Sequence, residues 1–269
     1  MESVRKPAVA GRFYPGEPAI LQRDLGAYLD PPRARSRALG CVVPHAGYMY
    51  SGHVAGAVYA ALELPRRFVI LCPNHTGMGE PLAIMSEGAW LTPLGLVPVD
   101  SPLAAALKQR FGLLHEDAYA HLAEHALEVQ LPFLQSQIDA FTFVPICVGV
   151  STFDPLARLG EAIAAAIQSQ PEPVLVIASS DMNHYEGDST TRKKDHKAIA
   201  KMLELDPQGL FETVHREHIS MCGYGPAVAM LTAARALGAT SAQLVKYATS
   251  ADISGDRETV VGYAGVMVS

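Results

Sequence analysis

The stretch LGCVVPHAGY, residues 39–48, joins a short apolar run to a polar turn that contains glycine. Leu39–Val43 is expected to be a buried β-strand, because the run is continuously apolar instead of alternating with polar residues. A helical pattern follows at Gly52–Leu62. The same order of apolar run and polar turn recurs in RFVILCPNHTG, residues 67–77, and in VLVIASSDMNH, residues 174–184. These segments predict strands and helices in alternation.

Strand-like and helical segments alternate over the rest of the chain from about residue 38, which is the pattern of an α/β fold with helices on both faces of a layered sheet. Further strands are expected at Phe141–Val148, Gln243–Thr249 and Thr259–Val268, and helices at Ala118–Gln135, Leu156–Ile167, Asp195–Leu203 and Pro226–Leu237. No internal repeat or linker interrupts the pattern, so a single domain spanning residues 1–269 is expected.

Composition narrows the class of protein. The net charge is −6, and no long run of basic residues is present, which argues against nucleic-acid binding. No run of about 18 apolar residues is present, so no membrane span is expected. The first residues lack the apolar core of a secretory signal, and the four cysteines are too far apart for a disulfide scaffold. A cytoplasmic protein is predicted, with Cys41, Cys72 and Cys147 acting as small buried apolar residues.

Three of the expected strands run directly into polar turns that carry His45, His75, and Asp181 with His184. If these strands are parallel, their carboxyl ends lie at one edge of the sheet, where ligands bind in open α/β folds. Imidazole is the commonest metal ligand among side chains. We therefore expect these residues to form one site.

Cys222 is a candidate third ligand. It lies in ISMCGYGP, residues 219–226, just before an expected helix. The start of a helix lowers the pKa of a thiol and favours thiolate, which binds metals and attacks carbon. An inert loop thiol is the alternative interpretation.

A second polar cluster lies in AHLAEHALE, residues 120–128. His121 and His125 are four residues apart and would share one face of a helix. The segment lacks the glutamate placement of the HExxH zinc signature, and a capped helix with satisfied polar side chains explains it equally well. We expect His125 and Glu128 to line the wall of a pocket and not to bind a metal directly.

At these residues the sequence resembles the Memo family, called AmmeMemoRadiSam system protein B in prokaryotes. The resemblance runs over almost the whole chain, from Arg5 to Tyr263. Its motifs are AGRFYP (10–15), HAGYMYSG (45–52), PNHTG (73–77), EHALEVQLPFL (124–134), SSDMNH (179–184) and MCGYGP (221–226). Each motif alone is weak evidence, whereas all of them in the family's order are specific.

The resemblance implies a fold similar to that of class III extradiol dioxygenases and a mononuclear site of two histidines and one cysteine. It assigns His45, His75 and Cys222 as ligands, with iron or copper as the metal and zinc as an alternative. Asp181 and His184 would line the same pocket, and His184 or His125 would act as acid or base. The expected catalytic residues are therefore His184, Asp181 and His125, and Tyr48, Asn74 and Glu128 are expected to contact the substrate.

Three functions remain open at this point. The first is a metal-dependent oxidoreductase related to non-haem iron dioxygenases, without a nucleotide cofactor. The second is a non-catalytic module that binds a peptide or small molecule in the same pocket. The third is a hydrolase or transferase with Cys222 as nucleophile. The prokaryotic family name also implies a radical-SAM protein and an AMMECR-type protein as partners.

Overall fold

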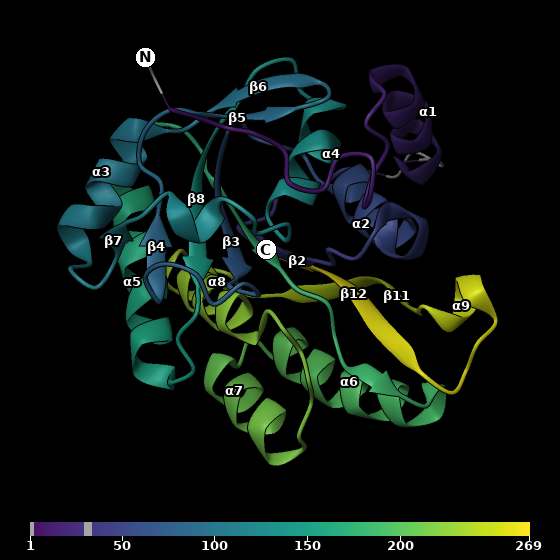
Figure 1. Ribbon diagram of the computed structural model, residues 1–269. Coiled ribbons are helices and arrows are strands. Elements are labelled where there is room, and N and C mark those ends of the chain that lie inside the picture. Colours follow the sequence, from purple (N-terminus) through teal and green to yellow (C-terminus); the bar gives the residue numbers. More distant parts are fainter. Residues whose placement is uncertain (1–2, 30–33) are drawn as a thin grey trace.

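Four parallel strands form the centre of the protein. The computed structural model describes residues 3–29 and 34–269, and in them these strands belong to a nine-stranded mixed sheet (Figure 1). Their order across the sheet is β2 (Gly40–Val43), β9 (Leu175–Ser179), β3 (Arg67–Pro73) and β8 (Thr142–Val148). Three of them are the apolar runs that precede the polar turns, and each lies within two residues of its expected position.

Further strands, most of them paired antiparallel, extend this sheet on both sides. On the β2 side the strands are β12 (Val260–Val268), β11 (Ala242–Thr249) and β10 (His184–Glu186), and on the β8 side they are β4 (Leu82–Ile84) and β7 (His115–Glu116). A separate three-stranded sheet contains β1 (Val4–Arg5), β5 (Ala89–Thr92) and β6 (Gly95–Pro98).

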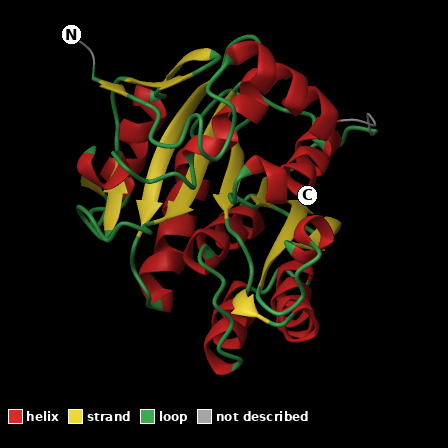
Figure 2. Ribbon diagram, turned by 45° about the vertical axis from the view of Figure 1, so that its right-hand side comes forward, coloured by secondary structure: helices red, strands yellow, loops and turns green. Residues whose placement is uncertain are grey.

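Helices cover both faces of the large sheet (Figure 2). One face carries α1 (Pro18–Leu29), α2 (Tyr48–Ala61) and α4 (Leu131–Gln135), and the other carries α3 (Ser101–Arg110), α5 (Phe153–Gln168), α6 (Asp188–Leu203), α7 (Pro207–Arg216) and α8 (Tyr224–Ala236). Successive residues of β3 alternate between the two cores: Phe68 and Ile70 pack on the α2 side, Val69 and Leu71 on the α8 side. Both faces are therefore apolar, which explains the continuous apolar runs. A last short helix, α9 (Ala251–Ser254), joins β11 to β12.

The prediction of one continuous helix at Ala118–Gln135 is wrong. The structure has two 3-10 turns, η1 (Tyr119–His121) and η2 (Glu128–Gln130), followed by the short α4. Pro132 has no N–H to donate and is tolerated only in the first turn of α4. Between the two turns, the carboxylate of Glu124 accepts the backbone N–H of Ala126, which competes with regular helical bonding.

An N-terminal strap, residues 4–15, packs on the core through the apolar side chains of Val9, Phe13 and Tyr14. Val9 and Tyr14 are buried. The carboxylate of Glu128 anchors the strap: it is ion-paired with Arg5 and accepts hydrogen bonds from the backbone N–H groups of Ala8 and Val9 and from the hydroxyl of Tyr14. This anchoring places Phe13 beside the carboxyl edge of the sheet. Among the described residues, no helix has the length and apolar character needed to cross a membrane.

Candidate metal centre

The carboxyl ends of β2, β9 and β3 lie side by side, with β9 in the middle. His45 follows the last residue of β2 by two positions, His75 follows β3 by two, and Asp181 follows β9 by two. The prediction that these three strand ends share one edge of the sheet is confirmed.

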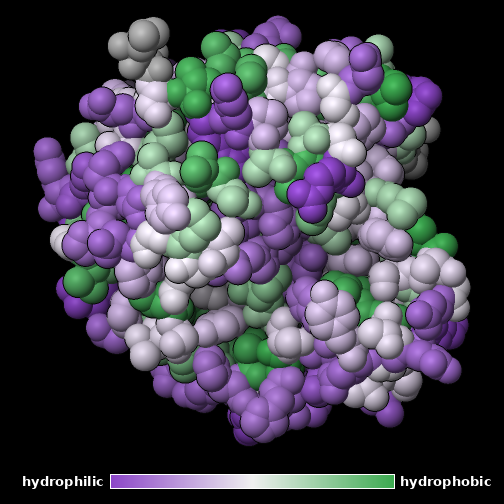
Figure 3. All heavy atoms as spheres, in the orientation of Figure 1, coloured by the Kyte–Doolittle hydropathy of each residue, from purple (hydrophilic) through white to green (hydrophobic). Residues whose placement is uncertain are grey.

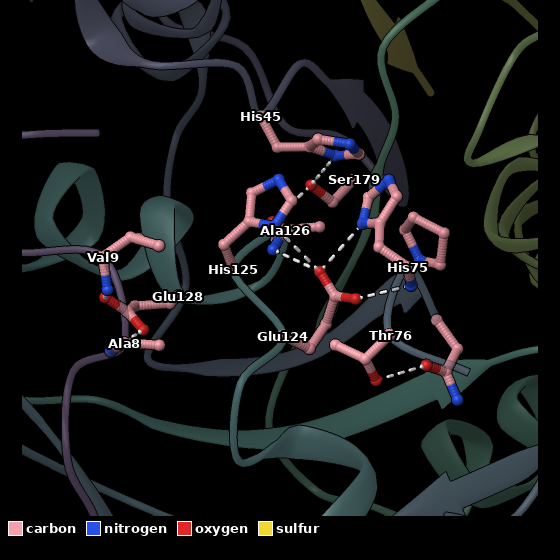
Figure 4. Close-up of polar contacts among 12 residues, drawn as sticks. Ala8, Val9, His45, His75, Thr76, Glu124, His125, Ala126, Glu128 and Ser179 are labelled. Atoms are coloured by element: carbon pink, nitrogen blue, oxygen red, sulfur yellow. Dashed lines mark hydrogen bonds and ion pairs between the residues drawn. The ribbon is translucent and has the colours of Figure 1, made fainter. Parts of the chain in front are cut away.

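Three imidazoles meet at this edge. One ring nitrogen each of His45, His75 and His125 lies within 4.8 Å of the others. The rings of His75 and His125 are stacked with their centres 4.8 Å apart, and His45 is nearly perpendicular to both. His125 reaches the cluster from the irregular segment between η1 and η2, so only two of the three histidines follow a strand (Figure 4).

Hydrogen bonds orient the ring of His45. Its Nδ1 lies 2.9 Å from the hydroxyl oxygen of Ser179, and that hydroxyl donates its own proton to the carbonyl of Ala126 at 2.6 Å. Since the Ser179 proton is already used, the Ser179 oxygen accepts from Nδ1–H of His45. The lone pair of His45 Nε2 is then free to bind a metal.

His75 and His184 are held in the same way. Nδ1 of His75 lies 2.9 Å from Oε1 of Glu124, and Nδ1 of His184 lies 2.9 Å from the carbonyl oxygen of Ser220. A carboxylate and a carbonyl can only accept, so each Nδ1 carries the proton and each Nε2 is free. The same Glu124 oxygen lies 3.4 Å from Nδ1 of His125.

The charges at the cluster favour a cation. Burial and the neighbouring imidazoles lower the pKa of His45 well below its usual value, and burial also lowers the pKa of His125. Burial alone would lower the pKa of His75, but the hydrogen bond to Glu124 outweighs it and the pKa is raised. Burial opposes ionisation of Glu124, yet the bond from His75 brings its pKa down to about 2. A buried anion thus lies behind the cluster, while burial disfavours the protonated forms of His45 and His125.

Cys222 lies next to this cluster but outside the group of three histidines. Its sulfur is 3.2 Å from Nε2 of His45 and 3.6 Å from the carbonyl oxygen of Asp181. α8 begins two residues later, as the sequence suggests, but the expected lowering of the thiol pKa does not occur. Burial and the nearby Asp181 carboxyl raise the pKa of Cys222, so the thiol keeps its proton at neutral pH unless a cation replaces that proton.

Imidazole nitrogen and cysteine sulfur are donors that suit iron, copper and zinc. His45, His75 and Cys222, with His125 beside them, therefore fit a mononuclear transition-metal site. Residues 5–267 match the model of the family described as Memo-like protein. This match agrees with the order of the motifs from Arg5 onward and with the geometry of the cluster. The chain belongs to the Memo family.

Curated relatives in the Memo family match the chain from end to end. A MEMO1 family protein of Pyrobaculum aerophilum is 46% identical over 276 residues, with 98% of each chain covered. Another, of Methanopyrus kandleri, is 43% identical over 280 residues, again with 98% of each covered. Among solved structures, an uncharacterized protein of Escherichia coli K12 has the same fold, with a TM-score of 0.56 and 12% identity over 86% of this chain and 100% of that one.

A cavity of about 590 Å³ opens over the cluster. It contains the six residues expected from the Memo motifs to hold a metal or to act as acid and base: His45, His75, Cys222, His125, Asp181 and His184. The rest of its wall is formed by Phe13, Ala46, Gly47, Tyr185, Ser220 and Val261. Figure 3 shows this side of the molecule, with a mainly hydrophilic hollow near its middle.

The three residues expected to contact a substrate do not line this cavity. Tyr48 is buried and donates its hydroxyl to the carbonyl of Val129 at 2.6 Å. Asn74 uses its side chain to close its own turn, through bonds with Met78 and Gly77. Glu128 points away from the imidazoles toward the strap (Figure 4). Each of these side chains is hydrogen-bonded to residues of the frame around the site.

Other parts of the site could not be foreseen from the motifs. His121 does not share a helix face with His125; it is fully buried against Trp90 and lies outside the cavity. Glu124 and Ser179, which orient imidazoles of the cluster, lie within recognised Memo motifs, but nothing in the sequence indicates this role for them. Asp181 is in the cavity, where one carboxylate oxygen accepts the backbone N–H groups of His45 and Ala46.

Proposed function

We propose that this Memo-family protein holds one iron or copper ion at His45, His75 and Cys222 and uses it for redox chemistry. One observation carries the proposal: Nδ1 of His45 and Nδ1 of His75 are each held by a hydrogen bond, and ring nitrogens of these two residues and of His125 lie within 4.8 Å of one another beside the Cys222 sulfur. Outer hydrogen bonds of this kind are the usual mark of histidines that bind metals.

The cysteine distinguishes this donor set from two histidines and a carboxylate, which suit iron and dioxygen. A thiolate is softer, which raises the relative affinity for copper and zinc and shifts the potential of iron. His125 is close enough to add a third nitrogen as a fourth ligand, or to exchange a proton with a bound molecule. The metal would supply electron transfer and activation of a bound ligand.

The chain's own residues would bind and protonate the substrate. His184 has Nδ1 held by the Ser220 carbonyl, so its free Nε2 is available as a proton acceptor in the cavity. Burial raises the pKa of Asp181, which makes this carboxyl a better proton carrier near neutral pH than an exposed one. Phe13 and Val261 would exclude water from one side of the ligand.

A second candidate is a thiol enzyme. Cys222 and His45 are 3.2 Å apart, which is within reach for an imidazole that activates a nucleophile. The raised pKa of the thiol weakens this candidate, because burial and Asp181 both oppose the thiolate.

A third candidate function is a non-catalytic module that binds a peptide or small molecule in the cavity. The exposed aromatic ring of Tyr185 at the cavity wall supports this candidate.

Metal analysis of untagged protein, purified without chelator, tests the proposal. We expect close to one equivalent of iron or copper per chain, lost in a His45→Ala and His75→Ala double variant. Oxygen consumption in the presence of a reductant should follow the metal content. Protein that takes up neither metal when offered both would contradict the proposal, and a ligand that binds equally well after chelation would favour the binding module.

A further inference from the structure

Glu124 joins two of the three clustered imidazoles through one carboxylate. On the basis of the proposed metal site, we propose that Glu124 is its positioning residue: it fixes the tautomer and direction of the His75 ring, so that Nε2 of His75 is left for a bound metal, and its carboxylate lies beside the His125 ring. Neither the sequence motifs nor the proposed set of metal donors assigns a positioning role to Glu124.

The carboxylate of Glu124 is fully buried and is surrounded by N–H groups. Oε2 accepts the backbone N–H of His75 at 2.7 Å. Oε1 accepts Nδ1–H of His75 at 2.9 Å and the backbone N–H of Ala126 at 2.8 Å, and lies 3.4 Å from Nδ1 of His125. Figure 4 shows this carboxylate between the two rings. One side chain therefore holds the backbone and the ring of His75 and places its charge beside Nδ1 of His125.

A carboxylate is the group that this arrangement requires. Every neighbour named above donates, so both oxygens must accept, and an ionised carboxyl has no proton of its own to compete. With Nδ1–H of His75 committed to Glu124, the proton cannot move to Nε2 without loss of that hydrogen bond. The two other imidazoles of the cavity are different, since neutral oxygens hold them: Ser179 for His45 and the Ser220 carbonyl for His184.

Glutamine at position 124 keeps the shape but replaces one accepting oxygen with an NH2 donor. If that NH2 faces the backbone N–H of His75, two donors oppose each other in a buried place, which is costly. If it faces Nδ1, this nitrogen must accept and the ring proton moves to Nε2, where it blocks the metal. Both outcomes weaken metal binding at His75 through an altered hydrogen bond, with the ligand residue itself unchanged.

The test compares Glu124→Gln with Glu128→Gln as a matched control. Glu128 lies on the same segment and is equally buried, but its partners belong to the strap. Affinity for Zn²⁺ and Cu⁺ is measured by competition with a coloured chelator. Loss of an outer hydrogen-bond partner lowers metal affinity about 10- to 100-fold, and we expect this for Glu124→Gln. Glu128→Gln should keep its affinity within about twofold of the wild type, since its partners do not touch the ligands.

A second measurement does not depend on a metal. Nitrogen NMR of the histidine rings in chelator-treated protein should show Nδ1–H for His75 in the wild type and in Glu124→Asp, whose carboxylate also only accepts. Glu124→Gln should show Nε2–H or a mixture of both tautomers. Unchanged tautomers together with unchanged metal affinity in Glu124→Gln would overturn the inference and leave the metal site standing. A wild type that binds no metal would overturn the proposed function, and the tautomers would then decide whether Glu124 orients these rings.

Discussion

The sulfur of Cys222 lies 3.2 Å from Nε2 of His45, although 177 positions separate the two residues in the chain. The thiol has two possible acceptors for its proton, Nε2 of His45 and the carbonyl oxygen of Asp181, which is 3.6 Å away. A metal held by both the sulfur and Nε2 would occupy the space where the thiol proton lies. A metal that enters must displace this proton, so the site is a place where metal and proton compete.

The first prediction concerns pH. Burial and Asp181 raise the pKa of Cys222, so the thiol is protonated across the neutral range and releases its proton when a metal binds. Metal affinity should therefore rise about tenfold per pH unit, and more steeply at acidic pH, where His75, whose pKa Glu124 raises, is protonated as well. Competition titrations at several pH values measure the slope, and affinity independent of pH would contradict a thiolate ligand.

The second prediction concerns the accessibility of the four cysteines. Cys41, Cys72 and Cys147 are buried in the core, whereas Cys222 is partly exposed at the cavity. Native protein should react with one equivalent of an alkylating reagent, at Cys222, and all four cysteines should react after unfolding. A bound metal should slow the single native reaction, and a chelator should restore it. Mass spectrometry locates the label, and label at Cys222 that metal does not slow would favour the thiol enzyme.

The third prediction uses two substitutions of Cys222. A serine hydroxyl is a poor ligand at neutral pH, so Cys222→Ser should weaken metal binding by more than the about 10- to 100-fold cost of losing an outer partner. Cys222→Asp recreates two histidines and a carboxylate, and should keep some affinity for Fe²⁺ while losing the preference for copper. Metal analysis of the variants prepared side by side gives the result. Equal metal in Cys222→Ser and wild type would remove Cys222 from the ligands and favour His125.

The fourth prediction concerns the strap. Arg5 and Glu128 form a fully buried ion pair, and removing one charge leaves the other unpaired. Arg5→Ala should lower the free energy of unfolding by about 3–5 kcal/mol, as measured by urea denaturation. The control is Arg23→Ala, whose partner Asp24 is near the surface, and this change should cost less than about 1 kcal/mol. A similar loss in both variants would mean that the strap does not depend on Glu128.

Much of the fold and of the site could be predicted because the relevant signals are local. The apolar runs before His45, His75 and Asp181 mark three buried strands, and parallel order alone brings their ends together. The motif around Cys222 placed the thiol before a helix, and α8 does begin at Tyr224. Each of these inferences needs only a few consecutive residues and the geometry of a parallel sheet.

The rest depends on contacts between distant residues. Tyr48 is in a recognised motif, but its direction is set by packing of α2 against Val129, far along the chain. Glu128 and Glu124 are four residues apart and look alike in sequence. One faces the strap and the other faces the imidazoles, because the expected helix is replaced by turns that send them to different partners. Periodicity cannot distinguish two such carboxylates.

The scattered origin of the donors also bears on how the protein is made. The ribosome delivers His45, His75 and His125 well before Cys222, and β2 has no neighbouring strand until β9 has emerged. A chain that ends anywhere before residue 222 therefore lacks one of the proposed donors, whatever metal surrounds it. The full set of proposed donors is therefore available only after synthesis has passed residue 222.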